Sequence, residues 1–174
     1  MMMTLTRTRM RAATVVAAAL VLCIPAQAAV AAPVPDTAVQ TMVAFTMTSA
    51  QTLDMRGIEP SMYRGKFFRD AAEKRRLCII KRESEGEYDV VSHNGYRGAY
   101  QVSDELARGA TWMMLPEHER ILGEDNAKRI LANLRQMPMN EWPRYWQDAA
   151  FHTVFNWEST GSGARHWAGG RWHC

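Results

Sequence analysis

The segment from residue 78 to residue 101 constrains the fold most, because its side-chain pattern changes period in the middle. A helical period runs from Ser61 to about Ser84, and Gly86 follows its end. Two short β-prone runs come next, on either side of Asn94-Gly95. An Asn-Gly pair between such runs is the strongest local signal for a β-hairpin. We therefore predict a helix that leads directly into one small hairpin.

The rest of the chain predicts further helices. They are expected at about 104–110, 116–122, 125–137 and 140–157, with Pro116 in a first turn and Asn140 as a cap. One face of the 61–84 helix carries Phe67, Ala71, Lys74 and Cys78, and an adjoining face carries Phe68, Ala72 and Ile79. Charge is expected elsewhere on it, at Arg69, Arg75, Arg76 and Lys81. The stripe of 125–137 is Ala127, Ile130, Leu134 and Met137. In the last helix the side chains expected to face inward are Trp142, Trp146, Ala149, Ala150 and Thr153.

These elements predict an α+β fold, mainly α, with one small hairpin in a single domain at 61–174. Residues 29–60 show no clear period and are interpreted as a linker or loosely docked arm. The five histidines show no metal-ligand spacing and are expected at the periphery.

The first residues have the pattern of a secretory signal peptide at 1–28. Three arginines precede an apolar stretch, and small residues follow it up to Ala28. The stretch is too short for a good membrane span, and no second long apolar run follows. Cleavage is predicted after Ala28, with Ala31 and Ala32 as alternatives. The chain is thus predicted to be secreted.

The charge of the exported chain balances overall but not locally. The full chain has 21 basic and 18 acidic residues, and three of the basic ones lie in the signal peptide. Residues 56–82 hold nine basic side chains against three acidic ones. A solvated helix face is expected there, and contact with an anionic wall polymer is the alternative. Zero net charge and export argue against a nucleic-acid partner.

The cysteines outside the signal peptide are Cys78 and Cys174. An even count in a small exported chain favours a disulfide, and only one pairing is possible. A metal site at His166, His173 and Cys174 is the weaker alternative, because its spacing is irregular. Cys23 raises the question of lipidation, but the bulky Leu22 before it is unsuited to a lipoprotein signal.

Glu83 is the main candidate for chemistry. A helix C-terminus disfavours a negative charge, and burial under the hairpin would act in the same direction, toward the protonated form that a general acid needs. Lys81 and Arg82 would oppose this effect if they point at the carboxyl group. The alternative interpretation is an ordinary surface glutamate at the end of a helix.

Two motif blocks carry a resemblance to a known family. The first is Glu83-Ser84 with Gly86, and the second is the run 98–101, Gly-Ala-Tyr-Gln. With the Asn-Gly turn between them, they resemble the lysozyme-like domains of actinobacterial resuscitation-promoting factors and the related lytic transglycosylases. The run 147–151, Gln-Asp-Ala-Ala-Phe, looks like the closing helix of that family. The resemblance covers roughly residues 68–174.

The family implies a lysozyme-like domain that cleaves peptidoglycan at the cell wall. It implies Glu83 as acid and base at the β-1,4 bond between N-acetylmuramic acid and N-acetylglucosamine, with no cofactor and no metal. The side chains expected to line the sugar cleft are Tyr96, Tyr100, Gln101, Trp112 and Trp157; for each tryptophan, core packing is the alternative. Other wall hydrolases are possible partners, and a monomer is expected.

The chain departs from the family in three ways. The turn after Glu83 holds two additional acids, Glu85 and Glu87. The Thr-Trp pair expected soon after Gln101 occurs only later, at 111–112. Cys78 lies five residues before Glu83, whereas in many relatives the two are adjacent.

Three functions remain open at this point. The first is peptidoglycan cleavage, as a lytic transglycosylase that needs one carboxylate or as a muramidase-type hydrolase. Candidates for a second carboxylate are Glu85, Glu87, Asp89 and Asp104, each expected to face solvent. The second is a non-catalytic module of the same fold that binds wall glycan or a partner. The third is an exported structural or interaction protein that acts through its basic helix at 61–82.

Overall fold

The computed structural model describes residues 49–158, 162–168 and 174. By its internal contacts the chain divides into Met1–Pro33 and Val34–Cys174, and every described residue belongs to the second unit. The predicted signal peptide, with its cleavage site and Cys23, lies outside the described residues. Along the described part, no helix is long and apolar enough to cross a membrane.

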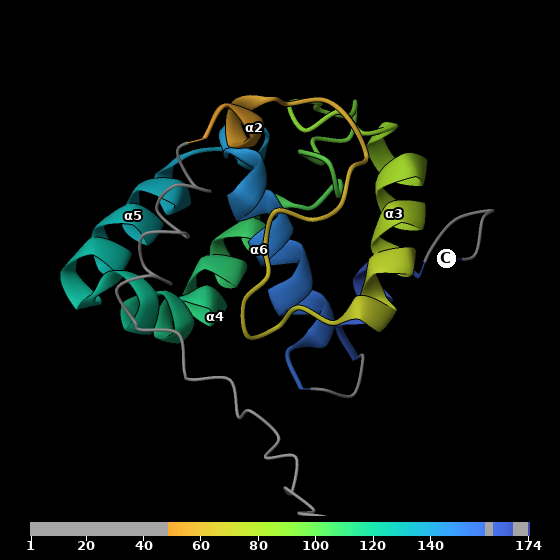
Figure 1. The fold of residues 1–174 in the computed structure, drawn as a ribbon. Coiled ribbons are helices and arrows are strands. Elements are labelled where there is room, and N and C mark those ends of the chain that lie inside the picture. Colours follow the sequence, from red (N-terminus) through yellow and green to blue (C-terminus); the bar gives the residue numbers. More distant parts are fainter. Residues whose placement is uncertain (1–48, 159–161, 169–173) are drawn as a thin grey trace, which may run out of the picture. The chain divides into compact units, whose positions relative to one another are not determined.

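The described chain is mainly helical, as predicted (Figure 1). Its α-helices are α2 (Ala50–Leu53), α3 (Asp70–Ser84), α4 (Asp104–Leu122), α5 (Glu124–Gln136) and α6 (Arg144–Asn156). Two 3₁₀ helices lie on either side of α6 in the sequence, η1 (Met139–Glu141) and η2 (Ser162–Trp167).

The predicted hairpin is not present as a pair of strands in the described residues. Val91 forms an isolated bridge with Arg97, and Arg97 forms another with Val102. The first turn closes at Gly95, whose φ of 82° lies in the region that glycine tolerates best. Because the chain reverses twice between 91 and 102, neither reversal leaves room for a continuous ladder.

Helix α3 ends where the sequence predicts but begins at Asp70 instead of Ser61. The preceding residues form turns that bury Tyr63 and Phe67, and the Phe67 N–H donates to the Tyr63 hydroxyl at 3.0 Å. Of the two faces described from the sequence, the first is exposed at Ala71, Lys74 and Cys78, whereas Ala72 and Ile79 of the adjoining face are buried. The buried side of α3 consists of Ala72, Arg76, Ile79, Ile80 and Ser84. Arg76, predicted to be on a charged outer face, is therefore an interior side chain.

The two predicted helices after residue 103 are one continuous helix, α4, with Pro116 inside it. Ser103 caps its start, since its side chain accepts a hydrogen bond from the Leu106 N–H. A proline in a helix interior removes one backbone hydrogen bond and costs about 3 kcal/mol. Helix α4 packs against both α5 and α6, and this burial outweighs the local cost.

Helix α5 matches its predicted bounds within one residue, but its buried stripe is Ala127, Leu131 and Leu134. Met137 lies partly exposed beyond its end. Asn140 belongs to η1 and does not cap the last helix, which begins after Pro143.

Helix α6 forms the centre of the core, because nearly every residue along it is buried. All five side chains predicted to face inward in this region are buried, which confirms that prediction. Figure 1 shows α6 in blue, drawn between α4 and α3. Such a helix, buried around its whole circumference, fixes the positions of the elements that pack on it.

Residues 49–60 are an integral part of the fold, which corrects their interpretation as a loosely docked arm. Thr52 is fully buried and its hydroxyl accepts a hydrogen bond from the Tyr145 N–H at 3.1 Å. The backbone of Arg56 forms an isolated antiparallel β-bridge with Glu87, and the Gly57 N–H donates to the Gly86 carbonyl at 2.9 Å. The segment therefore pairs with the turn that follows Glu83. The remainder of the predicted arm, 29–48, lies outside the described residues.

Cys78 and Cys174 are joined in a disulfide, with their Cα atoms 5.7 Å apart and a sequence separation of 96. The bond joins the middle of α3 to the C-terminal residue.

Candidate active site

The end of α3 places Glu83 in the last helical turn, directly before a sharp change of direction. Ser84 stabilises this end: its hydroxyl donates to the Ile80 carbonyl at 3.1 Å and accepts from the Gly86 N–H at 3.2 Å. Glu85 then adopts a left-handed conformation with a φ of 56°. A non-glycine residue in this conformation is uncommon and marks a constrained turn.

The Glu83 carboxylate is held by its sequence neighbour. Arg82 donates to Glu83 Oε1 from Nε at 2.9 Å and from Nη2 at 2.6 Å. The same Nη2 donates to the Trp167 carbonyl at 2.8 Å. The Glu83 side chain remains about one quarter exposed, and that of Arg82 about one eighth. Glu83 is thus neither a free surface acid nor a buried one.

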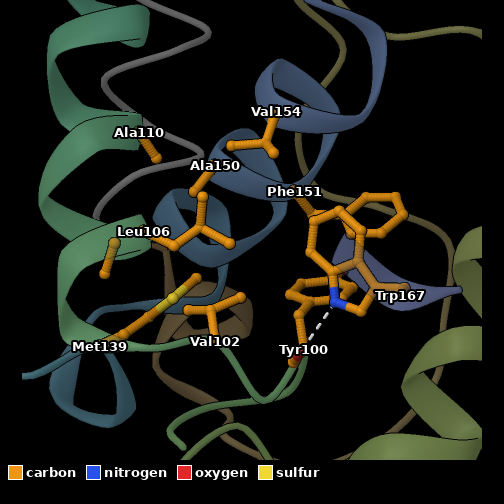
Figure 2. A pocket seen from close by; sticks show the side chains of 10 residues that line it. Tyr100, Val102, Leu106, Ala110, Met139, Ala150, Phe151, Val154 and Trp167 are labelled. Carbon is orange, nitrogen blue, oxygen red and sulfur yellow. Dashed lines mark hydrogen bonds between the residues drawn. The ribbon is translucent and has the colours of Figure 1, made fainter. Parts of the chain in front are cut away.

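Trp167, at the end of η2, contacts the residue before the first motif block and a residue of the second. Its carbonyl accepts from Arg82, and its indole N–H donates to the Tyr100 carbonyl at 2.8 Å, as Figure 2 shows. The indole packs on the Phe151 ring of α6 at a centroid distance of 4.8 Å. One buried tryptophan therefore connects the end of α3, the 98–101 run and the core helix.

The 98–101 run is fixed by Gln147 of α6. Gln147 Oε1 accepts from the Ala99 N–H at 2.9 Å, while its amide N–H donates to the Tyr88 carbonyl at 3.0 Å. Gly98 has a φ of 72°, and a Cβ there would lie 2.4 Å from Gln147 Oε1. The close approach of the amide thus requires glycine. Gln101 is half-buried and directs its own side-chain amide to the Gly98 carbonyl at 2.9 Å.

Tyr100 lies in the core, which corrects its prediction as a cleft residue. Its side chain is fully buried, and its hydroxyl donates to Asp148 Oδ1 at 2.5 Å and accepts from Arg76 at 3.0 Å. Tyr88 donates to the same Asp148 oxygen at 2.9 Å. Burial, followed by the charge of Asp148, raises the pKa of both tyrosine hydroxyls, so both act as donors at every physiological pH.

This buried network extends to α3 through Arg76, whose side chain is completely enclosed and lies 3.7 Å from Asp148 Oδ1. Arg76 also donates to Glu73. Burial alone raises the pKa of Glu73, but contacts with His152 and Arg76 and the Ser61 N–H outweigh it and lower that pKa to about 2. A buried arginine thus compensates two carboxylates.

Three other predicted cleft residues lie at the surface. Tyr96 is close to half exposed, on the first turn of the 91–102 segment. Trp112 is 59 % exposed on α4, with the Arg135 guanidinium 3.8 Å from its ring centroid. Trp157 is 42 % exposed and stacks on Phe67 at 5.3 Å. These aromatic rings lie on different elements, and no contact of the described residues joins any of them to Glu83.

Two hollows meet at Trp167. The first has about 210 Å³ of empty space, its open mouth included, and is almost entirely apolar, with Tyr100, Phe151 and Trp167 on one side (Figure 2). The second holds about 600 Å³ with its open mouth included and lies between α3 and η2, where Arg75 and Arg165 contribute the charged part of its lining. Glu83 itself is not among the lining residues of either hollow.

The candidates for a second carboxylate are partly exposed, and most have a cationic partner. Glu87 pairs with Arg56, which also lies 3.9 Å from Asp89. Asp104 accepts from Arg97 at 3.0 Å. Glu85 is exposed.

Two histidines are not peripheral, which corrects that prediction. His118 and His152 are fully buried. Burial lowers the pKa of His118, whose ring lies 2.9 Å from the Met114 carbonyl and 3.3 Å from the Tyr145 hydroxyl. Nearby, Glu117 accepts from the Tyr63 hydroxyl at 2.5 Å. No sequence signal separates these buried polar residues from surface ones, because each lies on a helix of mixed composition.

A metal site finds no support among the residues that the structure describes, where no group of three or more His, Cys, Asp or Glu side chains converges. Of the alternative metal ligands, Cys174 is in the disulfide and His173 lies outside the described residues. Comparison with family models, with curated proteins and with solved structures found no match for this chain.

Proposed function

We propose that the protein is an exported enzyme that cleaves peptidoglycan glycan strands, with Glu83 as the acid and base. The observation that carries the proposal is the double contact of Trp167. It links the Glu83 end of α3, through Arg82, to the 98–101 run, through the Tyr100 carbonyl. Two sequence blocks that resemble a catalytic motif only jointly are therefore joined through one residue.

The chemistry needs one carboxyl group. Glu83 protonates the oxygen of the β-1,4 bond, and the bond from that oxygen to the muramic acid C1 breaks. The N-acetyl group of the muramic residue then stabilises the cation, so a second carboxylate is not required. The muramic 6-oxygen in a transglycosylase, or a water oxygen in a hydrolase, then bonds to C1, and the ionised Glu83 takes the proton that this oxygen loses.

The alternative is a module of the same fold that binds wall glycan without cleaving it. Two observations favour it: Glu83 is paired with Arg82, and Glu83 lines neither of the hollows at Trp167. Both proposals place the protein at the cell wall. The signal-peptide pattern at 1–28 supports the export that such a location requires.

The test compares Glu83→Gln with Glu85→Gln, a matched change at an exposed neighbour. Purified chains are incubated with insoluble peptidoglycan, and the released muropeptides are measured by mass spectrometry. We expect Glu83→Gln to lower release at least about 100-fold, the lower end of the usual range for a general acid. Glu85→Gln should retain activity within about twofold. Thermal unfolding of both variants serves as the folding control.

The products separate the remaining possibilities. A 1,6-anhydro end marks a transglycosylase, and a free reducing end marks a hydrolase. Release by Glu83→Gln at the parent rate would remove Glu83 from the mechanism. Tight binding of the parent chain to peptidoglycan without any release would favour the binding module.

A further inference from the structure

The pairing of Arg82 with Glu83 is not one that a helix provides by itself. Successive side chains on an α-helix point about 100° apart, and neighbours at i and i+1 do not face each other. Here Arg82 nevertheless places Nε and Nη2 within 2.9 Å and 2.6 Å of one carboxylate oxygen. Something outside α3 has to stabilise this bent conformation.

The Trp167 carbonyl provides that stabilisation. It accepts from Nη2 of Arg82 at 2.8 Å, and Trp167 is itself almost fully buried. Near the start of η2, Gly163 packs closely on α6, since a Cβ there would lie 1.9 Å from the Val154 carbonyl oxygen. The core helix therefore fixes η2, η2 fixes the carbonyl, and the carbonyl orients the guanidinium.

The consequence for Glu83 is that its two oxygens differ. Oε1 accepts both hydrogen bonds from Arg82, whereas no described residue bonds to Oε2. A neutral carboxylic acid can keep accepting at Oε1, its carbonyl oxygen, while Oε2 carries the proton. When that proton leaves, the guanidinium is already in place beside the carboxylate that forms, and it need not reorganise.

We propose that Arg82 is a positioning residue: held by the Trp167 carbonyl, it fixes the Glu83 carboxyl group through Oε1 and leaves Oε2 as the oxygen that exchanges the proton with substrate. This inference rests on the proposed function, because it assigns a role within the same reaction. Arg82 makes no contact with substrate in this account and acts only through Glu83.

The experiment uses Arg82→Ala and Arg82→Lys in the full exported chain, with Lys81→Ala as the control at an exposed neighbour of the same charge. The substrate is a soluble glycan strand freed of its peptides, so that kcat and KM can be measured separately. We expect Arg82→Ala to lower kcat at least about tenfold, since small misplacements of a catalytic group are costly. KM should change by less than about twofold.

Two rescue measurements separate positioning from a merely structural role. Guanidinium ions added at low concentration should restore part of the kcat of Arg82→Ala, while sodium chloride at equal ionic strength should not. Arg82→Lys should recover activity only in part, because an ammonium group lacks the planar fork that reaches two acceptors. Lys81→Ala should match the parent.

The outcomes are distinct from those of the Glu83 test. If Glu83→Gln abolishes cleavage but Arg82→Ala keeps the parent kcat, this inference is wrong and the proposed function stands. A loss in Arg82→Ala that accompanies a lower Tm, and that guanidinium ions do not reverse, also overturns it. If Glu83→Gln keeps its activity, the proposed role of Glu83 is wrong, and the role inferred for Arg82, which depends on it, is wrong as well.

Discussion

Glu73 shows how a single side chain in this protein can make stability depend on pH. Its carboxylate receives hydrogen bonds from Arg76 and from the Ser61 N–H, and its Oε2 lies 3.5 Å from His152 Nε2. Burial opposes ionisation, but these partners together lower the Glu73 pKa from 4.5 to about 2. The ionised form is therefore stabilised in the folded state relative to the unfolded chain.

This shift predicts the direction of the pH effect. A carboxyl group with a lowered folded pKa contributes stability that is complete above its unfolded pKa, here 4.5, and that is lost as the pH falls toward 2. Glu73→Gln should lower the free energy of unfolding at pH 7 by about 2 kcal/mol and remove part of the loss between pH 4.5 and 2. Urea unfolding across this range measures both effects. Glu141→Gln, at an exposed site, is the control and should leave the curve unchanged.

At the scale of elements, the turn after α3 is held by a segment that the sequence does not connect with it. Gly57 and Met55 exchange backbone hydrogen bonds with Gly86 and Tyr88. A Cβ at Gly86 would lie 2.9 Å from Ile58 Cγ2 and 3.0 Å from the Gly57 backbone. Residues 55–58 therefore pack directly against the turn that follows the candidate catalytic glutamate.

Two glycines allow the backbone conformation and the packing to be separated. Gly86 has a φ of 89° and close neighbours, whereas Gly95 has a φ of 82° and nothing within 4 Å of a built Cβ. Gly95→Ala should therefore cost only the conformational part, about 1–2 kcal/mol. Gly86→Ala should cost clearly more and should also lower muropeptide release, because it moves the end of α3. Equal losses of unfolding free energy in the two variants would show that the contact with residues 57–58 is unimportant.

At the scale of the whole molecule, the disulfide closes a long loop around the candidate site. Cys78 and Cys174 are separated by 96 positions, and Glu83, the 98–101 run and Trp167 all lie between them. Cross-links that close long loops restrict the unfolded chain most. The bond therefore stabilises the arrangement as a whole and does not act on one contact.

Removal of the disulfide should lower stability substantially. We expect the Cys78→Ser, Cys174→Ser double variant to lose about 2–5 kcal/mol of unfolding free energy. Thermal unfolding of the parent chain with and without a reductant provides the comparison. The reductant should lower the Tm of the parent to that of the double variant and leave the variant unchanged. A parent Tm that does not respond to the reductant would contradict a stabilising role.

Part of the fold could be predicted from the sequence because it depends on neighbouring residues. The end of α3 before Gly86 and the bounds of α5 follow from local periodicity and local breakers, and the residues predicted to face inward in α6 are among its buried ones. The disulfide pairing could be predicted because only Cys78 and Cys174 lie outside the predicted signal peptide. Within the candidate site, the same kind of signal pointed to Glu83 at the end of a helix.

What the sequence alone determined about this protein is thus its mainly helical character, the end of α3, the bounds of α5, its disulfide partners and the candidate acid. Only the tertiary structure decided that Arg76 and Tyr100 are buried together, that α4 continues through Pro116, and that residues 55–58 pair with the turn at Gly86. It alone placed Trp167 between Arg82 and Tyr100. The physical reason is that each of these features depends on contacts between residues far apart along the chain. Local sequence preferences alone would allow the side chains of Arg76 and Tyr100 to face the solvent equally well.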